Sequence, residues 1–80
     1  MRRYYFDIRE GDEIFSDEEG LELSTIEKVQ EEAARSLADM ARDAARTIGG
    51  GSLQLSIEVR DDSGPVLHLK FTFAVERRRH

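Results

Sequence analysis

Few residues of this 80-residue chain have the side chains and spacing that catalysis needs. Ser56, Glu58 and His68 are the residue types of a nucleophile, an orienting acid and a general base. The alternating pattern around them predicts that all three lie on the polar face of two paired strands, where no pocket and no oxyanion donors are implied. We therefore interpret Glu58 and His68 as a polar cross-strand pair. We predict no catalytic residue and no enzymatic activity.

Acidic side chains are the second candidate, because seven of them fall between Glu10 and Glu22 with no basic residue among them. Carboxylates suit Ca²⁺ or Mg²⁺, but the D-x-D-x-D-G spacing of a calcium loop is absent, and the lack of cysteine excludes thiolate sites. We predict no metal site and no cofactor. The segment predicts instead a surface that attracts a basic protein partner, with these candidate contact residues: Asp12, Glu13, Asp17, Glu18, Glu19 and Glu22.

The charge distribution agrees with such a partner. The net charge is −5, with −7 on residues 1–32 and +2 on residues 33–80. Arg2 and Arg3 would form a basic patch with residues 77–79 if the first and last strands were neighbours, but an acidic domain with few exposed aromatic residues fits nucleic acid poorly. The sequence leaves open whether residues 77–80 are ordered or whether His80 is a tag remnant.

The start of the chain resembles neither a signal peptide nor a membrane span. The absence of cysteine is typical of an intracellular protein. We therefore expect a cytoplasmic protein that does not bind membranes.

The strands that position these residues are predicted from a period of two. The ranges are about 3–10, 13–16, 53–60 and 66–76. The last two strands should form a hairpin whose register places the apolar residues of both on one face. This register leaves residues 62–64 as a loop with Gly64 in a left-handed conformation. The expected pairs are Val59 with Leu67, Ile57 with Leu69, Leu55 with Phe71, Glu58 with His68, and Ser56 with Lys70.

A helix is predicted over about residues 25–48. Ser24 and Glu27 form a capping box, and Gly49–Gly51 supplies a left-handed stop. An apolar stripe with spacings of three and four should pack on the sheet. A second line of small residues either lies in a helix–helix contact of a homodimer or simply favours helix formation. We predict a homodimer with these candidate contacts: Ala34, Ala38, Ala41 and Ala45.

The order of elements is β-β-α-β-β over one domain, residues 1–80. It predicts a two-layer α+β fold, an antiparallel four-stranded sheet with one long helix packed on one face. The strand order stays open. A domain of this length buries a small core, which association with a second copy would enlarge.

Several stretches resemble a family of short, uncharacterised bacterial proteins classed as a domain of unknown function. They are RYYFDIREGD, DEEGLEL, EEAARSLADMARDA, IEVRDDSGPVL and FTFAVE. The match is most specific at residues 4–7, 17–20 and 59–61, and the family implies no activity. A more distant similarity is to HicB-like antitoxin domains, through the aromatic first strand, the hairpin and the Glu31–Ala33 segment. That similarity implies binding to a small basic ribonuclease toxin.

The sequence thus favours a non-catalytic protein-interaction module. The alternative is an antitoxin-type binder of a small basic ribonuclease.

Overall fold

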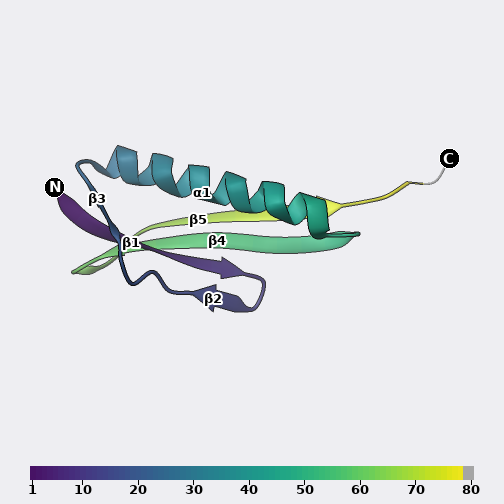
Figure 1. The fold of residues 1–80 in the computed structure, drawn as a ribbon, viewed down its shortest axis with the longest axis horizontal. Helices are drawn as coiled ribbons and strands as arrows, with labels where there is room; N and C mark the ends of the chain where they lie inside the picture. Colours follow the sequence, from purple (N-terminus) through teal and green to yellow (C-terminus); the bar gives the residue numbers. More distant parts are fainter. Residues whose placement is uncertain (79–80) are drawn as a thin grey trace.

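One long helix lies across one face of an antiparallel sheet in the computed structural model, which describes residues 1–78 (Figure 1). The α+β prediction is confirmed, but the sheet of these residues has five strands and not four. The additional strand, β3, was predicted as part of a connection. The elements are β1 (Arg2–Glu10), β2 (Glu13–Phe15), β3 (Leu21–Leu23), α1 (Ile26–Thr47), β4 (Gly51–Asp61) and β5 (Gly64–Val75).

The strand order is β2-β1-β4-β5, with β3 also paired to β1. β4 is central because it carries the most deeply buried residues of the sheet, Leu55, Ile57 and Val59. The first and last strands are therefore not neighbours. β1 starts at one end of the molecule, and the chain leaves β5 at the other, so the predicted basic patch does not form within the described residues (Figure 1). Arg79 and His80 lie outside the described residues.

The register of the β4–β5 hairpin is confirmed at all five predicted pairs, including Glu58 with His68 and Ser56 with Lys70. The turn differs from the prediction. Asp61 pairs with Gly64, so the loop has two residues, and the irregularity of the hairpin falls between Val59 and Arg60. Gly64 has the expected positive φ, at +125°.

Both ends of α1 differ from the predicted capping. Thr25 is the N-cap, because its Oγ1 accepts a hydrogen bond from the Lys28 amide at 3.2 Å. The prediction of a capping box at Ser24 was therefore wrong by one residue. At the other end, Ile48 is extended and its amide donates to the Ala44 carbonyl at 2.9 Å. The first left-handed glycine after the helix is Gly51, which starts β4.

The core lies between α1 and the middle of the sheet. Val29 and Ala33 from the helix and Ile57 and Val59 from β4 have no exposed surface. α1 packs on β4, β5 and β3. The helix therefore leaves the β1–β2 side of the same face less covered, and Phe15 on β2 is 50% exposed.

Candidate functional site

β2 and β3 are two parts of one broken edge strand. Both pair antiparallel with β1: β2 pairs with residues 8–10 and β3 with residues 2–4. The pairing offset changes by two residues between them, and residues 16–20 form the break. The acidic D-E-E-G sequence therefore interrupts a strand. Such an interruption also protects an edge strand from pairing with other chains.

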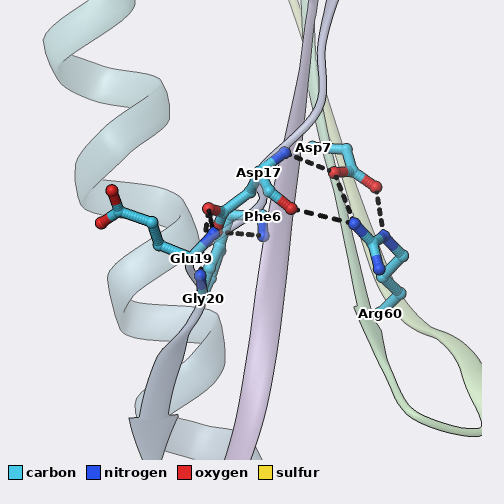
Figure 2. Close-up of polar contacts among 6 residues, drawn as sticks. All are labelled: Phe6, Asp7, Asp17, Glu19, Gly20 and Arg60. Carbon is cyan, nitrogen blue, oxygen red and sulfur yellow. Dashed lines mark hydrogen bonds and ion pairs between the residues drawn. The ribbon is translucent and has the colours of Figure 1, made fainter.

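Asp17 holds this break in place (Figure 2). Its Oδ1 accepts hydrogen bonds from the amides of Glu19 at 3.0 Å and Gly20 at 3.1 Å. Its Oδ2 accepts from the amide of Phe6 on β1 at 3.1 Å. The carboxylate thus satisfies three backbone donors that a continuous ladder would otherwise have paired. It fixes the loop to the strand.

Arg60 and Asp7 join the break to β4 (Figure 2). Arg60 Nε donates to Asp7 Oδ2 at 2.8 Å, and its Nη2 donates to the Asp17 carbonyl at 3.0 Å. Asp7 Oδ1 also accepts from the Asp17 amide at 2.9 Å. The Arg60 guanidinium stacks over the Tyr5 ring at 4.6 Å from its centroid. Residues 53 positions apart in the chain are thereby linked.

The electrostatics agree with this role. Burial raises the pKa of the Asp17 carboxyl, but hydrogen bonds from the Gly20, Phe6 and Glu19 amides and the charge of Arg60 outweigh burial, so its pKa lies below the ordinary value. The hydrogen bond to Asp7 is the main cause of the raised pKa of Arg60. Both groups are therefore charged at neutral pH and are already partnered.

Gly20 has a steric reason to be glycine. Its φ is +74°, and a Cβ there would lie 2.9 Å from Arg3 Cγ, 2.9 Å from Tyr5 Cε1 and 3.0 Å from the Tyr4 carbonyl oxygen. A side chain would be strained and would also collide with β1. Asp17 and Gly20 together thus define the shape of the break.

The predicted partner-binding acids fall into two groups in space. Asp12 and Glu13 lie at the β1–β2 turn, while Glu18, Glu19 and Glu22 lie at the break or on β3. All five are exposed, whereas Asp17 is half-buried and its carboxylate is occupied by backbone amides. Glu22 forms an ion pair with Arg3 at 3.1 Å. A partner can therefore reach the carboxylates of the five exposed residues more easily than the carboxylate of Asp17.

An apolar groove lies between α1 and the β1–β2 side of the sheet. It has a volume of about 390 Å³. Phe15 and Leu21, which are 50% and 42% exposed, contribute to its lining. Periodicity did not identify this groove, because it depends on how far the helix reaches across the sheet. Its lining residues are Phe6, Ile8, Phe15, Ser16, Asp17, Leu21, Glu32 and Ser36.

Acidic residues border this groove on both sides. Glu32 lines it from α1, and Asp39 and Asp43 follow on the same flank of the helix, at spacings of seven and eleven residues. Glu13 precedes Phe15 by two positions on β2 and so shares its face of the sheet. The three helix acids each form an exposed ion pair with an arginine three positions later. The groove therefore combines an apolar lining with a border of carboxylates that are partly neutralised on the helix side and are joined by Glu13 on the β2 side. We refer to it below as the acid-bordered groove.

The opposite, uncovered face of the sheet contains a second, more polar groove of about 580 Å³. Ser56, Glu58 and His68 all contribute to its lining. No hydrogen bond joins these three side chains in the part of the chain that the structure describes. Within residues 1–78, no group of three or more metal-binding side chains is gathered in one place. None of the helical segments among those residues has the length and apolar character of a membrane span.

The predicted dimer residues lie on the other flank of α1. Ala34, Ala38 and Ala45 are exposed and Ala41 is half-buried. This flank lies on the side of the buried stripe opposite Glu32 and Ser36, which line the acid-bordered groove over β1 and β2. It therefore faces the β5 edge of the sheet.

A protein-family model described as a domain of unknown function, DUF6894, matches residues 3–72. The searches of curated proteins and of solved structures found no match to the chain. The Asp7, Asp17, Gly20 and Arg60 cluster lies within the matched range. The cluster also joins residues 4–7, 17–20 and 59–61, the three stretches at which the resemblance to the family was most specific. That resemblance was the sequence signal that pointed to this cluster.

Proposed function

The chain belongs to the DUF6894 family, a domain of unknown function, and from this premise we propose that it is a non-catalytic protein-interaction module. Its ligand is a basic, partly apolar segment of a partner protein, which binds in the acid-bordered groove. The observation that carries the proposal is the exposure of Phe15 and Leu21 beside carboxylates on two elements.

Apolar and charged contacts have separate roles in this proposal. Exposed aromatic side chains at the centre of a contact supply most of the binding free energy. Carboxylates at the border supply attraction and orientation for a positively charged partner. The charge asymmetry of the sequence adds to this, since residues 1–32 carry −7. A small basic ribonuclease, as the antitoxin resemblance implies, has this chemistry and is one partner to test.

The bacterial cytoplasm, expected from the composition and the resemblance, is the compartment that we propose for this interaction. The partner would then be an intracellular protein.

The test uses two neighbouring residues of β2 as a matched pair. Phe15 lies on the helix-facing side with Ile8, while Ile14 pairs with Arg9 on the opposite side, and the two are 50% and 58% exposed. Proteins captured from the native cell by the wild type are identified, purified and titrated against wild type, Phe15→Ser and Ile14→Ser. We expect Phe15→Ser to weaken binding at least tenfold, and Ile14→Ser to leave it within about twofold.

A double variant tests the acids at the border of the groove. Glu13 and Glu32, which border the groove from β2 and α1, are changed to Ser together, and Asp17 is retained, because its loss would disturb the break itself. The affinity of wild type for the captured partner should fall as salt concentration rises. The affinity of the double variant should fall less steeply. Equal binding by wild type and Phe15→Ser, or affinity independent of salt, would contradict the proposal.

A further inference from the structure

Among residues 1–78, β5 leaves a long sheet edge unpaired. It is the last strand of the sheet, has 12 residues, and pairs with β4 along one edge. Its one proline, Pro65, lies next to its start, so nothing in the strand interior blocks a further hydrogen-bonded strand. Phe71 on this strand is 42% exposed. Natural proteins normally cover or interrupt an edge of this length, as this chain does at β2 and β3.

We propose that β5 of a second copy of this chain covers the edge. Two β5 strands pair antiparallel about a two-fold axis perpendicular to the sheet, which gives one continuous sheet with both helices on the same face. This interface goes beyond the proposed function, because it lies at the sheet edge opposite β2 and the acid-bordered groove.

The helix spacing fits this arrangement. Strands lie about 4.8 Å apart. α1 packs on both β4 and β5, so we place its axis midway between them, about one strand spacing from the two-fold axis. The two helices would then be about 9.6 Å apart, within the 8–10 Å of packed helices. Small side chains are needed at that distance, and the flank that faces β5 carries Ala34, Ala38, Ala41 and Ala45.

The helix ends are complementary in the antiparallel arrangement. With Ala38 near the axis, the first turns of one helix face the last turns of the other. The helix dipoles run in opposite directions, which is favourable.

The strand register follows from the side chains of β5. Centring the axis on Phe71 places Phe71 against Phe71 of the second copy and Lys70 against Thr72. Centring it one residue earlier would bring two lysines together, which is unfavourable.

The chain exposes more surface than a compact monomer of its mass, as its elongated shape implies. The chain exposes 6052 Å². A compact monomer of 9.2 kDa exposes about 4,900 Å². The difference is about 1,100 Å², and each partner of a standard interface buries about 800 Å².

Light scattering coupled to size exclusion tests the proposal at micromolar chain concentrations. We expect wild type to have twice the chain mass of 9.2 kDa. Ala38→Glu introduces a charge at an exposed helix position and should give a monomer with unchanged helix content by circular dichroism. Ser63→Glu adds the same charge at the exposed hairpin turn and should remain a dimer. A monomeric wild type, or a dimeric Ala38→Glu, overturns the proposal.

A cross-link tests the register without relying on the charged variant. The chain has no cysteine, so Phe71→Cys introduces a single thiol. Directly opposed residues of antiparallel strands have Cα atoms about 4.5–5.5 Å apart, within disulfide range. Mild oxidation should join most chains of Phe71→Cys into covalent dimers, and few chains of Ser63→Cys. Equal cross-linking of the two variants, or none in either, overturns the register.

Discussion

The removal of the Asp17 carboxylate should destabilise the fold although the residue lies in an acidic surface segment. Asp17→Ala leaves the amides of Phe6, Glu19 and Gly20 without their acceptor. A hydrogen bond contributes about 0.5–1.5 kcal/mol net, towards the lower end where water can replace it. With one of the three exposed, we expect the free energy of unfolding to fall by about 2–4 kcal/mol.

Thermal unfolding followed by circular dichroism measures this loss. A domain of this length shifts by about 4–8 °C per kcal/mol, so Tm should fall by about 8–32 °C at equal protein concentration. Glu18→Ala is the control, because Glu18 is an exposed neighbour with no hydrogen bond among the described contacts. Its free energy of unfolding should stay within about 0.5 kcal/mol of wild type.

The pH dependence gives an independent check. The pKa of Asp17 is lowered in the folded chain relative to the ordinary value of 3.8. The stabilisation by Asp17 is therefore complete above the unfolded-state pKa and is lost as pH falls through the lower folded-state pKa. The difference between wild type and Asp17→Ala should narrow below about pH 4. If Asp17→Ala unfolds at the same temperature as Glu18→Ala, the structural role of Asp17 is refuted.

Three further changes test other parts of the structure. Gly20→Ala should lower the free energy of unfolding by about 2–4 kcal/mol in urea titrations, because it adds a steric collision to a strained φ, while Gly64→Ala, with open space at its Cβ, should cost about 1 kcal/mol. Thr25→Ala should cost about 1 kcal/mol by thermal unfolding and Ser24→Ala almost nothing, because Thr25 is the N-cap. Ile57→Ala should cost about 3–5 kcal/mol in the same assay, since the side chain is fully buried.

Each comparison has an outcome that contradicts its reasoning. Equal losses for Gly20→Ala and Gly64→Ala would mean that the loop does not approach β1 as described. A larger loss for Ser24→Ala than for Thr25→Ala would restore the predicted capping box. A loss below about 1 kcal/mol for Ile57→Ala would place the core elsewhere.

The candidate site was only partly predictable. The acids were found by counting charge, and five of the six are indeed exposed. The sequence did not show that Asp17, unlike the other five acids, is half-buried and bonded to the backbone. The reason is that its three amide donors and the Asp7–Arg60 pair come from several parts of the chain. A D-x-x-G spacing gives a local turn signal, but it does not show what the turn packs against.

What the sequence determined by itself is local. Alternation specified the β4–β5 register at five pairs, because a slip of one residue would turn every apolar side chain outward. The period of three and four residues, with the end signals at Ser24 and Gly49–Gly51, specified α1 within one residue at each end.

Tertiary structure decided the rest. The place of β1 beside β4, and hence the separation of Arg2 from the end of β5, depends on which strand occupies the most buried position. The break at Asp17 needs Arg60 from the far end of β4. The acid-bordered groove exists because one helix is too narrow to cover the whole face of the sheet. These features depend on contacts between distant segments, which no local pattern specifies.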